Sequence, residues 1–257
     1  KIKETSADIV SVEYEYFNES IEDTLANAPL YKINHYNNPV SIENLSDYFF
    51  IKKWRLHPWD KLYHRNFLLE NKIEFQDIEA ANDVYFSAMS AILADKIAYV
   101  DTTRPLVHYR VNTTSQTSNR RTPMHSYYAF KHVQEELIKR GLWSRYSRKV
   151  ALLFLNNVLG ELQKRINEKK GREGYEFLQK EGLKALGVDQ LADYQEIVDQ
   201  FKTKSFDDKW LAEDVMLKKR LYQQVARMNE VIGFLKKSRC ALWGGGGLYT
   251  FFFRVYR

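Results

Sequence analysis

The sequence predicts an α/β region followed by an all-α region, with the change of pattern at about residue 122. Two observations support this prediction. Up to that point, short runs of β-branched and aromatic residues alternate with amphipathic helical patterns, as they do in α/β domains. Beyond Pro123, apolar residues recur at helical spacing, and no strand pattern is found as far as about residue 237. We therefore predict an α/β domain at 1–122, a helical accessory domain at 123–237, and at 238–257 the start of a truncated further module or a tail.

The α/β region is expected to begin with a strand over 7–17, where apolar and β-branched residues alternate in part with polar ones. A polar, Asn-rich stretch over 18–44 predicts a long loop. A helix is expected over 42–51, and the Ser41 hydroxyl is its expected N-cap because it can accept a hydrogen bond from an early helical N–H. A second helix is expected over 82–94, where the apolar spacing is less regular.

Two short strands close the α/β region. They are expected at 97–100 and 106–111, separated by a Thr-Thr-Arg-Pro turn. The resulting alternation of strands and helices is the order that an α/β domain requires.

The helical region is predicted from its apolar series. Phe130, Val133 and Leu137 are spaced three and four residues apart, as on one face of a helix. A longer ladder with a spacing of four predicts a second helix with a buried face. The ladder consists of Val150, Phe154, Val158, Leu162 and Ile166. Helical patterns continue over 194–201, and the four-three spacing over 221–235 is typical of a coiled-coil seam or of a long helix packed on another.

Glycines punctuate this region. Gly171 and Gly174 are expected to bracket one break between helices, and Gly182 and Gly187 another. The glycine run at 244–247 follows a short apolar stretch and fits the first two glycines of a dinucleotide-binding turn, but not the third. The alternative for this run is the first strand and turn of a truncated module, or a tail.

The composition is that of a folded chain without a membrane span. Charged residues make up 28% and hydrophobic residues 44%, and no uninterrupted apolar run approaches the roughly 18 residues that a spanning helix needs. The single cysteine, Cys240, precludes an intramolecular disulfide and fits a reducing compartment. We therefore expect a cytoplasmic protein.

The formal net charge of +6 and the pI near 9.1 favour anionic partners. Phosphate groups and an anionic lipid surface are the candidates, so peripheral contact with the inner face of a membrane is also expected. Nucleic acid is not favoured, because basic residues are interspersed with acids along helices, as at 163–170, and do not form one basic stripe with interleaved aromatic residues.

Three ordered blocks carry most of the functional information. They lie at 58–68 (P-W-D-K-L-Y-H-R-N-F-L), 82–86 (N-D-V-Y-F) and 97–101 (I-A-Y-V-D). Loops between apolar segments here bring a Trp, a Lys, an Arg and an acid together, which suits a polar pocket. The structural alternative is that Trp59 and Leu62 are core anchors and that the charged residues are solvated flanks.

In this order and at this spacing, the blocks resemble the acceptor-side half of a family 2 glycosyltransferase of the Rossmann-like GT-A fold. In that family a W-[ND]-K-L-Y-x-R segment precedes an [E/N]-D-x-x-F motif and a short strand that reads I-A-Y-V-D. The resemblance covers about residues 7–120. It implies an inverting, hexosyltransferase-type enzyme, in which a hydroxyl of a glycan or lipid-linked acceptor displaces the nucleoside diphosphate of a nucleotide sugar, as in bacterial surface polysaccharide synthesis.

The resemblance also assigns the acid that does the chemistry. Asp83 matches the position of the family's catalytic base, and Asn82 stands where Glu is usual. Direct displacement needs a carboxylate within hydrogen-bond reach of the acceptor hydroxyl. Asp77 and Glu79, just upstream, are the alternative candidates.

Side-chain chemistry supplies the rest of the candidate site. Lys61 and Arg65 could neutralise a diphosphate or orient an anionic acceptor, and Trp59 offers an apolar face on which a sugar ring can stack. His108, near the end of the last strand, could bind a divalent cation as neutral imidazole, although a lone His on a strand is more often a hydrogen-bonded structural residue. The predicted substrate-binding residues are Trp59, Asp60, Lys61, Arg65, Asn82 and Arg110.

The nucleotide-binding half of the family pattern is not found in this sequence. No D-x-D motif occurs before Asp83, so the main ligands of the Mn²⁺ or Mg²⁺ that the resemblance implies are expected outside this chain. We therefore expect a monomeric fragment of a longer enzyme, inactive by itself. The alternative is a non-catalytic helical interaction or scaffold protein, in which the α/β region is only a support.

Overall fold

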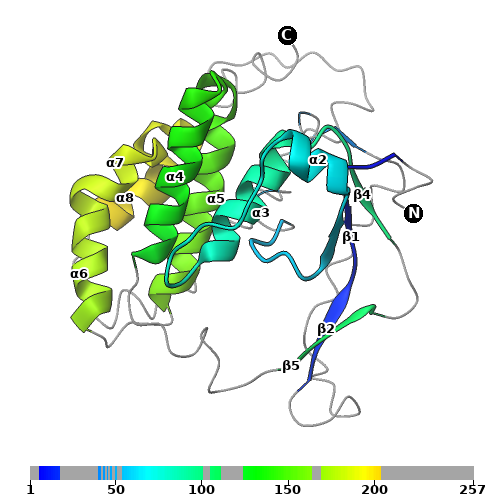
Figure 1. The fold of residues 1–257 in the computed structure, drawn as a ribbon. Helices are drawn as coiled ribbons and strands as arrows, with labels where there is room; N and C mark the ends of the chain where they lie inside the picture. Colours follow the sequence, from blue (N-terminus) through cyan, green and yellow to red (C-terminus); the bar gives the residue numbers. More distant parts are fainter. Residues whose placement is uncertain are drawn as a thin grey trace, which may run out of the picture.

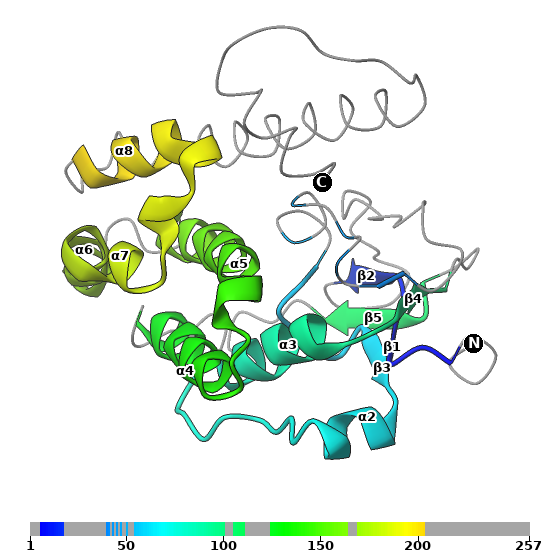
Figure 2. The same ribbon diagram turned by 90° about the horizontal axis from the view of Figure 1, so that it is seen from above.

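The structure, a computed structural model, places two small β-sheets beside a layer of helices (Figure 1). Helix α3 (Asn82–Leu93) lies between the sheets and that layer, so the two parts of the chain meet along it (Figure 2). The residues that the structure describes are 6–17, 40–41, 43, 45, 47, 50, 54–100, 105–110, 124–163 and 169–203.

Strands β1 (Ile9–Ser11), β3 (Lys61–Tyr63) and β4 (Ile97–Tyr99) form the first sheet. β1 is the central strand, antiparallel to β3 and parallel to β4. Every residue of β1 and β4 is buried. Their apolar sequences are those of strands covered on both faces.

Strands β2 (Tyr14–Phe17) and β5 (Val107–Arg110) form a second sheet of two parallel strands (Figure 1). β4 and β5 confirm the strands predicted at 97–100 and 106–111. Along β5, half-buried residues alternate with exposed ones, so only one face of this sheet is covered.

The single strand predicted over 7–17 is wrong, because the chain changes partners in its middle. The Val12 N–H donates to the carbonyl oxygen of Asp60 over 2.9 Å, and the Leu106 N–H donates to the carbonyl oxygen of Glu13 over 3.1 Å. Both partners are distant in the sequence. These bonds separate β1 from β2, and no local alternation of residues can reveal such a change.

Helix α3 confirms the helix predicted over 82–94. Its residues 84–92 are all buried, as expected for a helix enclosed on most sides. Strand β3 and the short helix α2 (Arg65–Glu70) are not predicted by the sequence pattern. The K-L-Y sequence of β3 contains no β-branched residue, and the six residues of α2 are too few to show a helical period.

The chain described from residue 124 onward consists of helices and turns, as predicted, and no strand occurs in that part. The elements are α4 (His125–Lys139), α5 (Trp143–Gln163), α6 (Lys169–Phe177), a π-helical turn (Leu178–Gly182), α7 (Leu183–Ala185), two 3-10 turns (Val188–Gln190 and Ala192–Tyr194) and α8 (Gln195–Thr203). None of the helices in the described part is both long and apolar enough to cross a membrane.

One hydrophobic core continues from the first sheet into the helical layer. Helix α3 packs against α4 and α5, and α4 packs against α5 (Figure 2). Of the predicted ladder, Val150, Phe154 and Val158 are buried, whereas Leu162 and Ile166 lie outside the residues whose side chains are described. The helical layer therefore shares its core with α3, and the boundary predicted at residue 122 falls in a segment outside the described residues.

The glycine breaks are predicted correctly at only one position. Gly171 and Gly174 lie inside α6 and are buried, so no break occurs there. Gly182 ends the π-helical turn and continues into α7, where an added Cβ would meet Leu178 Cδ2 at 2.7 Å. Gly187 does end the helix, since its φ of 70° is in the left-handed region that favours glycine.

The segment predicted as a helix over 42–51 is described at a few positions only. The Glu43 N–H donates to Ser41 Oγ over 3.4 Å, which is the predicted capping bond. Asp47 joins this segment to the helical layer, because its Oδ2 lies 2.6 Å from the Arg148 guanidinium and 3.3 Å from the Tyr194 hydroxyl. The predicted seam over 221–235 and the glycines at 244–247 lie outside the described residues.

The burial of Phe154 predicts a large loss of stability on truncation. Its ring packs edge-on against Phe130 with the ring centroids 5.4 Å apart, and it is fully buried. Phe154→Ala should lower the free energy of unfolding by about 3–5 kcal/mol, through lost burial and the cavity left behind. Ile138→Ala on α4 is the control, because Ile138 is 56% exposed and should change stability little. Denaturant unfolding measures both, and a loss below about 1 kcal/mol for Phe154→Ala would contradict the described core.

The partly buried amine of Lys149 on α5 should make the protein more stable at alkaline pH. Its ammonium nitrogen lies 5.3 Å from the ring centroid of Phe50 and 5.7 Å from that of Tyr146. Burial lowers the pKa of Lys149 from 10.5 to about 8, and Asp47 opposes this only in part. Because the folded pKa is below the unfolded one, stability should increase as the pH rises from about 8 to about 10.5.

The matched measurement for Lys149 is Lys149→Met, which removes the titrating group. The free energy of unfolding of the wild type minus that of Lys149→Met should increase between about pH 8 and about pH 10. A difference independent of pH would show that the amine is solvated.

Candidate functional site

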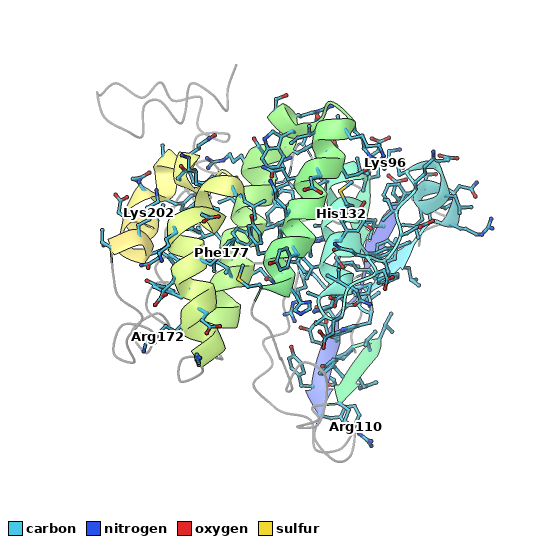
Figure 3. The ribbon with its side chains drawn as sticks, turned by 60° about the vertical axis from the view of Figure 1, so that its left-hand side comes forward. Lys96, Arg110, His132, Arg172, Phe177 and Lys202 are labelled. Carbon is cyan, nitrogen blue, oxygen red and sulfur yellow. The ribbon has the colours of Figure 1, made fainter. Side chains whose placement is uncertain are left out.

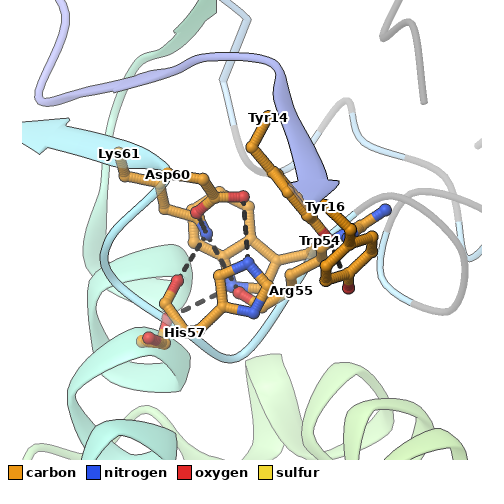
Figure 4. A network of polar contacts seen from close by, with 8 residues as sticks. Tyr14, Tyr16, Trp54, Arg55, His57, Asp60 and Lys61 are labelled. Carbon is orange, nitrogen blue, oxygen red and sulfur yellow. Dashed lines mark hydrogen bonds and ion pairs between the residues drawn. The ribbon is translucent and has the colours of Figure 1, made fainter. Parts of the chain in front are cut away.

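A buried ammonium group organises the loop that precedes β3. The Lys61 side chain is 1% exposed, and its Nζ donates to the carbonyl oxygens of Arg55 and His57 over 3.1 and 2.8 Å (Figure 4). Its third partner is Oδ1 of Asp60. All three N–H donors of the ammonium are therefore satisfied, and the loop 55–61 is closed around this one charge.

The second oxygen of Asp60 faces His57. Asp60 Oδ2 lies 3.3 Å from His57 Nε2, in a bent contact. Burial alone would raise the pKa of Asp60, but the contact with His57 and the charge of Lys61 outweigh it and hold that pKa below its usual range. Burial lowers the pKa of His57 and of Lys61, and Asp60 opposes both shifts. The ionised carboxylate of Asp60 thus attracts both the Lys61 ammonium and the His57 ring.

Trp59 is the middle ring of a stack of three. The His57 ring lies 3.9 Å from the Trp59 ring at an interplanar angle of 2°, and the Tyr109 ring lies 4.9 Å from it at 27°. Two rings side by side on one face of an indole would collide at these centroid distances. His57 and Tyr109 therefore cover opposite faces of Trp59.

Tyrosines from β2 complete this aromatic group. The Tyr14 ring meets the Trp59 ring edge-on, with centroids 4.6 Å apart, and the hydroxyls of Tyr14 and Tyr16 lie 3.1 Å apart. The Arg55 guanidinium carbon lies 4.4 Å from the centroid of Tyr14, within cation–π distance. The stack thus joins the loop 55–61 to both strands of the second sheet.

This geometry bears on two of the predicted roles. Both faces of the half-buried Trp59 indole carry a ring of the protein, and the sugar stacking expected for Trp59 stays a prediction. The Lys61 ammonium has no donor left for a diphosphate, and it lies beneath Asp60, which is itself only 4% exposed. Lys61 and Asp60 therefore hold the conformation of the loop 55–61.

The other predicted residues lie apart from this group. Arg65 is exposed on α2, beyond the end of β3 that is far from Asp60. Arg110 is exposed at the end of β5 (Figure 3), with its guanidinium carbon 5.6 Å from the Phe17 ring. His108 Nδ1 lies 2.6 Å from Glu15 Oε1, an ion-pair contact across the two strands of the second sheet. The structure thus does not bring these cationic side chains to one point.

Asp83 lies in the first turn of α3 and is half-buried, after Asn82, which is exposed. Ser87 is one turn further along the same face, and its carbonyl oxygen accepts a hydrogen bond of 3.2 Å from Trp54 Nε1. The face of α3 that carries Asp83 is thus the face that meets the loop before β3. Ala81 just before the helix has a φ of 61°, a conformation that a non-glycine residue adopts only under constraint.

The alternative acids differ in exposure. Asp77 is exposed. The Glu79 side chain is 65% exposed, and its Oε2 lies 4.0 Å from His125 Nε2 at the start of α4. Asp83 is less exposed than either and remains the predicted base.

The sequence prediction did not single out His57, Arg55, Tyr14 or Tyr109. The position of His57, two residues before Trp59, is a signal that could have been used, since a titratable ring beside a functional block is a candidate for the same site. For Tyr109 the signal is weaker, because its contact with Trp59 depends on the pairing of β2 and β5. In the described part of the chain, no group of three His, Cys, Asp or Glu side chains could hold a metal ion.

Comparison with known proteins gives a structural likeness and no sequence match. No protein-family model and no curated protein sequence matches the chain. Crystal structures of S. aureus TarS 1-349 are similar to it, with a TM-score of 0.59 and 14% identity for the complex with UDP-GlcNAc. The TM-score is 0.51 with 16% identity for the complex with UDP, and 0.54 with 14% identity for a further structure of TarS 1-349.

These likenesses establish the fold. They cover 87% of this chain, whereas the chain spans about 60% of the length of the TarS chains. The mixed α/β sheets and helices described above therefore share the fold of TarS. Membership of family 2 and of the GT-A class stays a prediction from the motifs.

The closed loop around Lys61 predicts a strong dependence of the fold on this ammonium. Lys61→Met would leave the Asp60 carboxylate buried without its cation, and should lower the free energy of unfolding by about 3–5 kcal/mol. Lys96→Met is the control, because Lys96 is exposed and should change stability by about 0.5 kcal/mol or less. Denaturant unfolding measures both, and equal effects of the two substitutions would show that Lys61 is solvated.

Proposed function

We propose that the chain is part of a glycosyltransferase that moves a sugar from a nucleotide sugar to a hydroxyl of a glycan or lipid-linked acceptor, in the synthesis of a surface polysaccharide. The observation that carries this proposal is the likeness of fold to S. aureus TarS over 87% of the chain. The ordered blocks at 58–68, 82–86 and 97–101 support it independently, because they are features of the sequence alone.

The donor side of the proposal is a nucleoside diphosphate sugar. TarS structures hold UDP-GlcNAc and UDP, so a uridine diphosphate sugar is the first donor to test. A divalent cation, Mn²⁺ or Mg²⁺, would neutralise the leaving diphosphate, with its main ligands outside this chain. His108 could contribute to that site only if it exchanged its contact with Glu15, and it is the one candidate ligand proposed from this chain.

The acceptor side of the proposal centres on Asp83. In the inverting reaction that the motifs imply, the Asp83 carboxylate takes the proton of the acceptor hydroxyl while that oxygen attacks the anomeric carbon and the nucleoside diphosphate leaves. The position of Asp83 in the first turn of α3 also places this negative charge at the positive end of the helix dipole, which stabilises the carboxylate before the reaction. Asn82 is the proposed supporting residue beside it.

The net charge suggests where the enzyme works. A charge of +6 favours attraction to anionic lipid headgroups, and a lipid-linked acceptor would be presented at such a surface. We therefore place the proposed enzyme in the cytoplasm, as a monomer in peripheral contact with the inner face of the membrane.

Replacement of Asp83 tests the proposed function. The chain, produced together with any sequence that precedes it in its gene, should release UDP from UDP-GlcNAc or another UDP sugar in the presence of acceptor. Asp83→Asn keeps the shape of the side chain and removes the base, so kcat should fall by about a hundredfold or more, while UDP binding measured by calorimetry should change little.

Asp77→Asn is the matched control for this test. Asp77 is an exposed acid of the preceding loop, so its replacement should leave kcat near the wild-type value. If Asp83→Asn retains more than about a tenth of the wild-type turnover, the assignment of the base fails. If no UDP sugar is turned over by the wild type, the non-catalytic scaffold alternative is favoured.

A further inference from the structure

The surroundings of the His57 imidazole favour one tautomer. Its Nε2 is buried and faces Asp60 Oδ2 at 3.3 Å, and the ring lies flat on Trp59. An unprotonated Nε2 would point its lone pair at the negatively charged carboxylate, and the two would repel each other. The proton of the neutral ring therefore belongs on Nε2, and Asp60 is itself fixed by the ammonium of Lys61.

The other ring nitrogen is left with a lone pair and an opening. Within the described part of the chain, His57 Nδ1 accepts no hydrogen bond and is not enclosed. The His57 side chain is 21% exposed although Nε2 is buried, so the exposed part of the ring includes the Nδ1 side. Lys61, Asp60 and His57 thus form a relay of three groups that ends in one accessible acceptor (Figure 4).

We propose that His57 Nδ1 accepts a hydrogen bond from a sugar hydroxyl, which makes His57 a sugar-binding residue of the site. This inference rests on the proposed glycosyltransferase function for the identity of the ligand as a sugar. Its geometry rests only on the described residues. No group named here was assigned this role by the sequence motifs.

The surroundings favour a hydroxyl over an anion. The charged groups that face His57 are Asp60 and Lys61 at the end of the loop and Arg55 at its start, and the Tyr14 ring faces it from β2 with the centroids 5.6 Å apart. Burial, Lys61 and Arg55 all disfavour the imidazolium form and lower the pKa of His57 below 6.5. A neutral ring can accept from a hydroxyl, whereas a phosphate would need the protonated ring as donor.

Nitrogen-15 NMR of this chain with labelled histidine tests the tautomer directly. At about pH 7.5 the His57 signals should show a protonated Nε2 and an unprotonated Nδ1. Asp60→Asn should shift the proton toward Nδ1, because an amide facing Nε2 can donate to it. A wild-type ring protonated on Nδ1 would overturn the proposal.

Titration with N-acetylglucosamine tests the ligand. The sugar should shift the His57 Nδ1 signal, and its affinity should fall as the pH is lowered through the folded pKa of His57, below 6.5. His57→Phe keeps a flat ring for Trp59 and removes the acceptor, so the affinity should fall about three- to tenfold, the loss of one neutral hydrogen bond. The control is His132→Gln, since His132 is exposed on α4 and its replacement should leave the affinity unchanged.

Two other outcomes would overturn the inference. A sugar that leaves the Nδ1 signal unchanged would show that His57 is structural only. Inorganic phosphate that shifts the ring signals more strongly at acid pH would show an anion site. If His57→Phe does not fold, the pH dependence of the sugar affinity of the wild type still tests whether Nδ1 accepts the hydrogen bond. Loss of UDP-sugar turnover with an intact sugar response at Nδ1 would count against the proposed function and not against this contact.

Discussion

The buried ammonium of Lys61 is the contact on which the rest of the α/β region depends. It neutralises Asp60 and binds two carbonyl oxygens of its own loop, so one charge closes the turn that leads into β3. The carbonyl oxygen of Asp60 in turn accepts the Val12 N–H, at the point where the chain leaves the first sheet for the second. Burying two ions costs free energy that only good geometry recovers, and here every ammonium donor has a partner. The same two residues therefore hold the corner between the two sheets, and Asp60 also contacts the His57 ring.

The aromatic stack holds the loop 55–61 against the second sheet. Because Trp59 is covered on both faces, the second sheet is joined to the loop through side chains as well as through hydrogen bonds. A two-stranded sheet is marginal by itself, so the contacts of Tyr14 and Tyr109 with Trp59 stabilise β2 and β5 together.

The parts of the fold with a clear local period could be predicted from sequence, and the parts made by distant contacts could not. The apolar spacing gave α3, α4 and α5 correctly, and the short apolar runs gave β4 and β5. The break between β1 and β2 depends on bonds to Asp60 and Leu106, which no local pattern contains. The candidate site followed the same rule: the motif drew attention to the loop before β3, but the covering of Trp59 by Tyr109 and the closure around Lys61 depend on tertiary contacts. The helix break predicted at Gly171 and Gly174 was wrong, because a buried glycine inside a helix and a glycine at a break look alike in sequence.

The wide sequence separation of the closing contacts has a consequence for synthesis of the protein. β1 near the start of the chain is complete only when β4 pairs with it, and Asp47 meets Tyr194 across 147 residues. The strand pairs of the two sheets therefore close only after about residue 110 has left the ribosome. Chains with such distant contacts fold slowly and expose apolar strands in the meantime, which favours aggregation. The two sheets should thus form more slowly than the packed pair of helices α4 and α5, whose contacts are close in the sequence.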